Sequence, residues 1–326
     1  MKQGWIVEKG AGPQVTQVAP PAPVAGMVHL RLRAAALNFA DLLMVEGRYQ
    51  DSPPFPFVPG LEGAGEVIAA PPGSRFRPGD RVAYLGHGAL AQQVMAPEDR
   101  LTPLPDGLGW AEAAGFQIAY GTSHLALTAR AGLRPGEVLA VLGAAGGVGL
   151  TAVELGAALG ARVIGLARGA DKVAAVRAAG AEVALDSAAI PDADLRDTLR
   201  AAARGMGARG VDVVYDPVGD APGLAAFGAL SAGGRFLVVG FAGGTPPALP
   251  LNHALVKNIA IHGIHWGGYR ALDPALLRAS LAEALDLAGR GLIRPHAGAT
   301  LPLERLAEGY AALRERRAIG KLVVTL

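Results

Sequence analysis

Cysteine is absent from this chain of 326 residues. No disulfide framework, thiolate nucleophile or cysteine-ligated zinc site can therefore form. A chain without cysteine fits the reducing cytoplasm, although it is compatible with other compartments as well. We expect a cytoplasmic protein.

Long apolar runs and blocks of like charge are also missing. No segment approaches the ~18 uninterrupted apolar residues of a membrane span. The first residues, MKQGW, are not followed by the apolar core of a signal peptide. The formal net charge is only +2, with no basic block to bind nucleic acid. We therefore expect neither a membrane nor a nucleic acid as a partner.

Apolar residues, by contrast, are plentiful. They make up 51% of the chain, which is enough for sizeable packed cores. The length favours about two domains. Glycine and proline number 46 and 24, and their combined share stays below the range of disordered chains.

A buried strand that runs into a glycine cluster is the centre of the sequence. The apolar run 138–142 leads into residues 143–149, and a small-residue helical pattern follows. Such a turn directs backbone N–H groups and the positive end of a helix at an anion. Gly146 would let the backbone approach a pyrophosphate, and Gly149 would let the helix pack on the strand. Ala144 replaces the first glycine of the usual G-x-G-x-x-G, so an ordinary tight turn is the alternative.

Strands alternate with helices from this turn to about residue 263. The predicted strands are 138–142, 162–166, 182–185, 211–215, 235–239 and 259–262. The predicted helices are 148–159, 171–179, 194–204, 222–231 and 252–257. This alternation implies an α/β fold with a doubly wound parallel sheet, a Rossmann domain of full size.

The two ends of the chain follow other patterns. Residues 1 to about 100 are predicted to be rich in β-structure: Val28–Arg33 alternates polar and apolar residues, and one or two helical turns are expected over 36–44. After residue 263 we expect a helix over 274–291, another over 303–314 and a last strand. The tail is too short for a domain of its own. The predicted domains are thus 1–120 with 264–326, and 121–263.

The residue after the second strand of a Rossmann domain selects the cofactor. An acidic residue there binds the ribose of NAD, whereas a basic residue accepts the 2′-phosphate of NADP. Arg168 stands at this position, 19 residues after Gly149, and Lys172 lies one helical turn further on. We interpret Asp171 as the N-cap of the next helix, although it is the competing ribose ligand. Alternatively, Arg168 and Lys172 are only solvated charges of a loop. The sequence favours NADPH as the cofactor.

Several short motifs occur in a characteristic order along the whole chain. They are 36–41 (ALNFAD), 47–49 (GRY), 58–65 (VPGLEGAG), 78–82 (PGDRV), 144–149 (AAGGVG), 216–219 (DPVG) and 320–321 (GK). In this order and spacing the chain resembles the zinc-free quinone oxidoreductases of the medium-chain dehydrogenase/reductase superfamily, above all the zeta-crystallin-like NADPH:quinone oxidoreductases. The resemblance implies a β-rich, GroES-like catalytic domain beside the Rossmann domain.

Departures from the zinc-dependent relatives point in the same direction. Those relatives carry a cysteine where this chain has Asn38, a histidine where it has Leu61, and a cysteine-rich zinc lobe. Without these ligands we expect no metal, and zinc cannot polarise the substrate. One departure concerns the cofactor: Ser187 stands where such relatives often place a tyrosine near the adenosine.

The resemblance also implies roles for individual residues. Asn38, Asp41 and Tyr49 are expected on the substrate side of the nicotinamide as the catalytic group. Tyr49 would donate a proton or anchor a water, unless it only packs against neighbouring prolines. Asp41 would hold the local backbone or orient Asn38. We interpret Glu62 as structural.

A larger set is expected to contact the cofactor. Its members belong to the glycine turn, to the ends of later strands and to the C-terminal tail. They are Thr122, Ala145, Gly146, Gly147, Val148, Gly149, Arg168, Lys172, Val218, Gly219, Gly240, Phe241, Ala242, Trp266, Arg317 and Lys321.

The activity implied is hydride transfer from NADPH to a small-molecule acceptor, a quinone. An enone or an enoyl or acryloyl thioester could accept hydride in the same way. A non-catalytic NADPH-binding protein is the alternative of another class. We expect a homodimer in which the strand 259–262 pairs with its copy across a two-fold axis. A monomer with this strand covered by the tail is the alternative.

Overall fold

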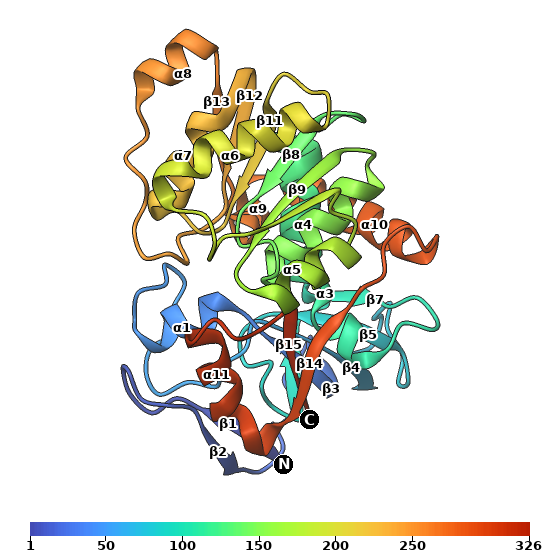
Figure 1. Cartoon of the computed structure of the whole chain (residues 1–326). Helices are drawn as coiled ribbons and strands as arrows, with labels where there is room; N and C mark the ends of the chain where they lie inside the picture. Colours follow the sequence, from blue (N-terminus) through green and yellow to red (C-terminus); the bar gives the residue numbers. More distant parts are fainter. The chain divides into compact units, whose positions relative to one another are not determined.

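The computed structural model describes all 326 residues. The chain forms two compact units (Figure 1). The first unit comprises Met1–Gln117 and Pro295–Leu326, and the second comprises Ile118–Arg294. None of the helices combines the length and the apolar character needed to cross a bilayer.

The second unit is built on a six-stranded parallel sheet in the order β10-β9-β8-β11-β12-β13. The strands are β8 (Val138–Val141), β9 (Arg162–Ala167), β10 (Val183–Asp186), β11 (Val211–Asp216), β12 (Leu230–Val238) and β13 (Ala260–Gly263). Numbered along the chain, this is the order 3-2-1-4-5-6 of a dinucleotide-binding fold, which confirms the predicted Rossmann domain. The predicted strands agree to within a residue or two, except that β12 begins at Leu230 rather than at 235.

Helices follow each of the first five strands of this sheet. They are α4 (Gly147–Ala158), α5 (Ala170–Ala178), α6 (Asp192–Gly205), α7 (Asp220–Ala229) and α8 (Leu251–Lys257). Val138 and Ala140 share a core with Leu195 of α6. Leu139 faces the other way, because a Cβ added to Gly156 of α4 would lie 2.6 Å from its side chain. Both faces of β8 are therefore covered, which is why the strand reads as a continuous apolar run.

The second unit extends to Arg294, beyond the boundary predicted at residue 263. Besides the sheet and its helices, this unit contains α3 (Phe116–Leu125) from Ile118 onward, a π-helical turn (Ala126–Arg130), a 3-10 turn (Trp266–Gly268), α9 (Tyr269–Leu272) and α10 (Pro274–Gly289). His124 of α3 and Ser280 of α10 form a buried hydrogen bond of 2.8 Å. Residues 264–294 therefore group with the second unit, although they were predicted to belong to the first.

The first unit contains a seven-stranded sheet and a two-stranded one. The large sheet has the order β14-β15-β3-β4-β5-β7, and β6 also pairs with β3. The strands are β1 (Lys2–Trp5), β2 (Gln14–Gln17), β3 (Val28–Leu37), β4 (Glu62–Ala69), β5 (Arg81–Leu85), β6 (Gln93–Ala96), β7 (Leu101–Pro103), β14 (Ala297–Pro302) and β15 (Lys321–Thr325). The helices are α1 (Phe39–Val45), α2 (Trp110–Ala114) and α11 (Leu306–Arg314), and short 3-10 turns cover Glu98–Arg100 and Leu303–Arg305.

Strand β3 is longer than the sequence indicated. Ala36 pairs with Glu62 of β4, and Leu37 pairs with Leu322 of β15. The helical turns expected over 36–44 therefore begin only at Phe39, because these two ladders hold Ala36 and Leu37 in the sheet. The same register brings the starts of β4 and β15 to the end of β3.

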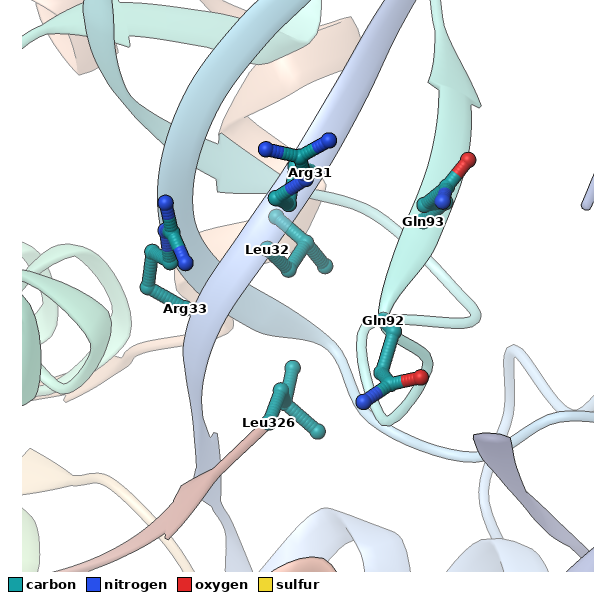
Figure 2. A pocket seen from close by; sticks show the side chains of 6 residues that line it. All are labelled: Arg31, Leu32, Arg33, Gln92, Gln93 and Leu326. Carbon is teal, nitrogen blue, oxygen red and sulfur yellow. The ribbon is translucent and has the colours of Figure 1, made fainter. Parts of the chain in front are cut away.

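A pocket of about 180 Å³ opens on the first unit. Figure 2 shows its lining residues, Arg31, Leu32, Arg33, Gln92, Gln93 and Leu326. Arg33 forms an ion pair of 3.1 Å with Glu66. None of the lining residues belongs to the predicted site.

Candidate active site

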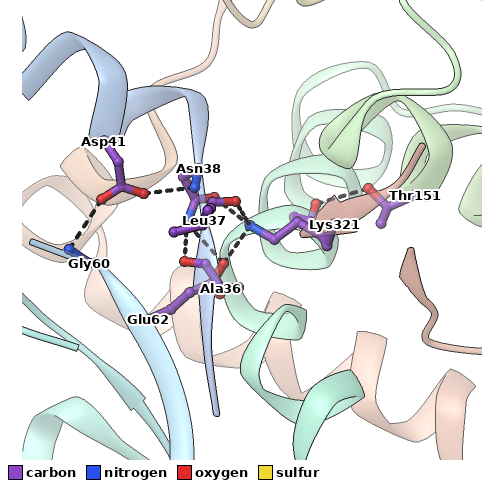
Figure 3. A network of polar contacts seen from close by, with 9 residues as sticks. Ala36, Leu37, Asn38, Asp41, Gly60, Glu62, Thr151 and Lys321 are labelled. Atoms are coloured by element: carbon purple, nitrogen blue, oxygen red, sulfur yellow. Dashed lines mark hydrogen bonds and ion pairs between the residues drawn. The ribbon is translucent and has the colours of Figure 1, made fainter. Parts of the chain in front are cut away.

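A buried polar cluster lies at the end of β3 in the first unit (Figure 3). Asn38 connects β3 to α1, Glu62 is the first residue of β4, and Lys321 is the first residue of β15. The two strand ladders that flank Ala36 and Leu37 bring these three side chains to one place.

Lys321 lies at the centre of the cluster. Its ammonium donates to the backbone oxygen of Leu37 at 3.1 Å, to Asn38 Oδ1 at 2.6 Å and to Glu62 Oε1 at 2.8 Å. A lysine ammonium has three donors, and all three are used here. The predicted contact of Lys321 with the cofactor stays a prediction, and these three bonds leave its ammonium no free donor for a phosphate or a ribose.

The amide of Asn38 has a defined orientation. Its Nδ2 donates to Glu62 Oε1 at 3.1 Å and makes a long contact of 3.5 Å with Ala36 O. The amide oxygen faces the Lys321 ammonium, since a cation cannot be paired with the amide nitrogen. One lone pair of Oδ1 remains, so Asn38 can accept a further hydrogen bond but offers no good donor.

Asp41 is fully buried in α1. Its Oδ2 accepts the backbone N–H of Asn38 at 2.7 Å, and its Oδ1 accepts that of Gly60 at 3.2 Å. Burial raises the pKa of Asp41 to about 7, against the opposing effects of both backbone bonds and of Lys321. Of the two expected roles, this geometry favours holding the local backbone.

Tyr49 follows α1 and is half-buried. Its ring packs against the core of the first unit. Burial, together with the charges of Asp51 and Asp41, raises the pKa of the Tyr49 phenol above its usual value. The hydroxyl is therefore protonated at neutral pH and can donate a proton.

The glycine turn lies at the carboxyl end of β8 in the second unit. Gly143 adopts a φ of +55°, a conformation that glycine tolerates and other residues rarely adopt. This residue makes the tight turn, so Ala144 can replace the usual glycine and is buried. A Cβ on Gly149 would lie 2.2 Å from Gly143 O, so the missing side chain lets the helix approach the strand.

Basic residues follow the next strand, β9. Arg168 is exposed directly after it, and Lys172 lies in the first turn of α5. The prediction that Asp171 is the N-cap of α5 is wrong. The N-cap is Gly169, whose φ is +90°, and Asp171 lies inside the first turn. The reason is Asp186 of β10, whose carboxylate accepts the backbone N–H of Gly169 at 2.9 Å.

The loops after β11 and β12 are joined to each other. Asp216 Oδ1 accepts the backbone N–H groups of Val218 and Gly219, both at 2.8 Å. Ala242 N–H donates to Pro217 O at 3.0 Å, which fixes the segment that contains Gly240, Phe241 and Ala242. A Cβ on Gly143 would lie 2.9 Å from the Val218 side chain. The glycine turn and these two loops thus line one edge of the sheet.

Three buried hydroxyl groups connect the elements next to this edge of the sheet, and no sequence motif predicted their contacts. Ser123 Oγ lies 2.8 Å from Thr151 Oγ1 and 3.0 Å from the Tyr215 hydroxyl, so it connects α3, α4 and β11. Thr122, next to Ser123, is buried. Trp266 is also buried, against Gly121 of α3, where a Cβ would lie 2.6 Å from the indole ring.

The remaining predicted residue, Arg317, lies in the first unit. It is exposed and pairs with Glu315 at 2.6 Å. Its contact with the cofactor stays a prediction. No group of three or more His, Cys, Asp or Glu side chains in the chain is arranged to hold a metal ion.

Comparisons with known proteins match nearly the whole chain. Residues 24–106 match the alcohol dehydrogenase GroES-like domain, and residues 147–287 match the zinc-binding dehydrogenase family. The expected GroES-like domain is thereby confirmed. Quinone oxidoreductase-like protein 2 of Rattus norvegicus is 33% identical over 318 residues, which are 96% of this chain and 89% of that protein.

Solved structures agree with the sequence relatives. The quinone oxidoreductase of Thermus thermophilus, also solved in complex with NADPH, superimposes with a TM-score of 0.84 at 33% identity, and the match covers 100% of both chains. A probable oxidoreductase of Mycobacterium abscessus has a TM-score of 0.87 at 30% identity, over 100% of this chain and 99% of that one.

Proposed function

The chain belongs to the quinone oxidoreductase family of the medium-chain dehydrogenase/reductase superfamily, and from this membership we propose that it transfers hydride from NADPH to a quinone. The observation that carries the proposal is the closed network of Asn38, Glu62 and Lys321. Asn38 stands where zinc-dependent relatives carry a cysteine, and its amide is bound to Glu62 and Lys321 instead. A quinone is reduced readily without a metal to polarise it.

NADPH is the cofactor, and the edge of the second unit fits it. The N-terminus of α4 has glycine as its N-cap, and a Cβ on Gly146 would meet only Gly143 O, at 3.3 Å. This backbone would hold the pyrophosphate. Arg168 and Lys172 would bind the 2′-phosphate, because a guanidinium offers a planar pair of donors. When bound, NADPH supplies a hydride at C4 of its nicotinamide.

Residues of the first unit would serve the acceptor. A quinone that receives a hydride also needs a proton, and Tyr49 is protonated at neutral pH, since its pKa is raised. The hydroxyl would donate that proton to the quinone oxygen. Asn38 would accept a hydrogen bond through the remaining lone pair of Oδ1 and would not polarise the quinone.

We propose that the reaction needs no metal. The chain has no cysteine, and no three suitable side chains are grouped around one point. The buried Glu62 carboxylate is already paired with the Lys321 ammonium at 2.8 Å.

We propose that the protein is a homodimer. Strand β13 ends the sheet and pairs only with β12. The tail does not cover it, since β15 pairs with β3 and β14. Beside it, α8 exposes Leu255 and Val256, each 78% accessible, and β13 itself exposes Ile261. An open strand edge next to apolar side chains is suited to pairing with a second copy.

A substrate panel tests the proposed activity. Purified protein is mixed with NADPH and, separately, with quinones, enones and enoyl thioesters, and NADPH oxidation is followed by absorbance. We expect the highest kcat/KM with quinones. Higher kcat/KM with an enone or thioester would reassign the acceptor, and binding of NADPH without turnover of any acceptor would indicate a non-catalytic protein.

A further inference from the structure

We propose that Lys321 is the built-in cation of the acceptor site: a positioning residue whose ammonium fills an oxygen-lined cation site and locks the amide of Asn38. The inference rests on the proposed function for its catalytic consequence, but the cation site itself does not depend on that function.

Three oxygen atoms converge on the Lys321 nitrogen. They come from a backbone carbonyl (Leu37), an amide (Asn38) and a carboxylate (Glu62), at 3.1, 2.6 and 2.8 Å. Carbonyl and carboxylate oxygens in this arrangement are the ligands of a bound cation. Here the cation is covalently attached to the chain and cannot dissociate.

Because the pair is buried, the Glu62 carboxylate depends on the Lys321 ammonium for compensation of its charge. Glu62 is 0% exposed and Lys321 is 5% exposed. A buried carboxylate that loses its cation is left uncompensated in a medium of low dielectric constant. Removal of the ammonium should therefore create a site that takes up a small cation from solution.

The fold provides room for the lysine stem. Gly115 ends α2, and a Cβ there would lie 3.3 Å from Lys321 Cβ and 3.4 Å from its Cγ. A side chain at Gly115 would touch the stem of Lys321 and require it to shift by a few tenths of an ångström, so the glycine leaves this path clear. A site shaped along the whole side chain distinguishes this lysine from a surface residue in a chance contact.

The consequence for Asn38 is a single amide orientation. The ammonium requires the oxygen on one side, and the Glu62 carboxylate requires the nitrogen on the other. Without Lys321, a rotated amide would no longer be penalised by a cation facing its nitrogen. The ammonium thus keeps one lone pair of Asn38 Oδ1 available in a fixed direction.

Chemical rescue tests the proposal. Lys321→Ala removes the ammonium and its stem, and ammonium or methylammonium chloride is added to the variant, with tetramethylammonium chloride as a control of equal ionic strength. We expect kcat/KM for a quinone to fall by ~tenfold or more, as for other misplaced active-site groups. The small cations, but not the large one, should raise both Tm and kcat/KM.

Two results would overturn the proposal. One is that neither ammonium nor methylammonium raises Tm above the level reached with tetramethylammonium. The other is that NADPH affinity, measured by titration without any acceptor, falls as much as kcat/KM, because Lys321 would then act on the cofactor. The effect of small cations on the Tm of Lys321→Ala can be measured even if the protein reduces no quinone. Failure of the proposed function is therefore distinguishable from failure of the cation site.

A charge-balanced variant separates positioning from stability. In Lys321→Met combined with Glu62→Gln, both charges of the pair are removed. We expect Tm to return toward that of the native protein while kcat/KM stays low, because the amide of Asn38 is no longer locked. Full recovery of both would reduce Lys321 to a structural ion-pair partner and contradict the proposal.

Discussion

Asn38 Oδ1 lies 2.6 Å from Lys321 Nζ, although 283 residues separate the two in the sequence. The contact exists because β15, from the end of the chain, pairs antiparallel with β3 near its start. The proposed acceptor-binding cluster therefore depends on the pairing of β15 with β3 in the first unit.

Cofactor preference should depend on Arg168. A charge-assisted hydrogen bond contributes about 1.5–3 kcal/mol, or roughly tenfold to a hundredfold in affinity. Arg168→Ala should weaken NADPH binding by that factor and leave NADH binding unchanged, as measured by titration of both cofactors. Arg177→Ala, an exposed arginine later in α5, is the matched control. Tighter binding of NADH than of NADPH by the native protein would contradict the assignment and make Asp171 the candidate ribose ligand.

Tyr49 should act on the acceptor and not on the cofactor. Tyr49→Phe keeps the packed ring and removes the hydroxyl. If the hydroxyl donates the proton, kcat/KM should fall by roughly tenfold or more, while the Kd for NADPH stays constant. The decrease should be larger for enones than for strongly oxidising quinones. Unchanged turnover with both acceptor classes would show that Tyr49 only packs.

The buried carboxyl of Asp41 predicts a pH-dependent stability. Burial raises its pKa from 3.8 to about 7. An acid with a raised pKa in the folded state contributes stability below its unfolded pKa and loses that contribution as pH rises through the folded pKa. The native protein should therefore lose stability relative to Asp41→Asn between about pH 4 and 7, by an amount on the order of 3 kcal/mol.

Denaturant unfolding of both proteins across this range measures the difference. Asparagine is neutral and of similar size but can accept only one of the two backbone N–H groups, so its cost is a constant offset and only the pH-dependent part of the difference reports titration. A difference in unfolding free energy that does not change with pH would show that Asp41 does not titrate in this window.

The dimer predicted through β13 should be disrupted on α8. Leu255→Glu combined with Val256→Glu adds charge to two exposed side chains next to the strand edge. Light scattering at micromolar concentration should give twice the chain mass of 33.1 kDa for the native protein and the chain mass for the variant. Leu272→Glu, at a side chain that is 74% exposed in α9, should leave the dimer intact. A native protein of 33.1 kDa would rule out the dimer at that concentration.

The Rossmann half of the fold was predictable from the sequence because its signals are local. Apolar runs such as 138–142, bounded by glycine, specify buried parallel strands, and the helices follow within a few residues. The turn at Gly143 also explains why the glycine fingerprint tolerates Ala144.

The parts that sequence reasoning missed depend on distant partners. The contacts of Lys321 with Glu62 and Asn38 were not predicted, because nothing local shows that β15 places the lysine there. Asp171 was expected to cap α5, but Asp186 from the neighbouring strand binds Gly169 instead. The helix over 274–291 was predicted, yet its sequence does not reveal that it contacts α3.

The most direct test of the central claim is the rate of NADPH-dependent quinone reduction by protein dialysed against a strong chelator. Elemental analysis of the same sample establishes its metal content. The account predicts full kcat/KM with less than stoichiometric metal, because Lys321 provides the fixed cation at Asn38 and Glu62. Activity that is lost on dialysis and restored by zinc, or no reduction of any quinone, would contradict it.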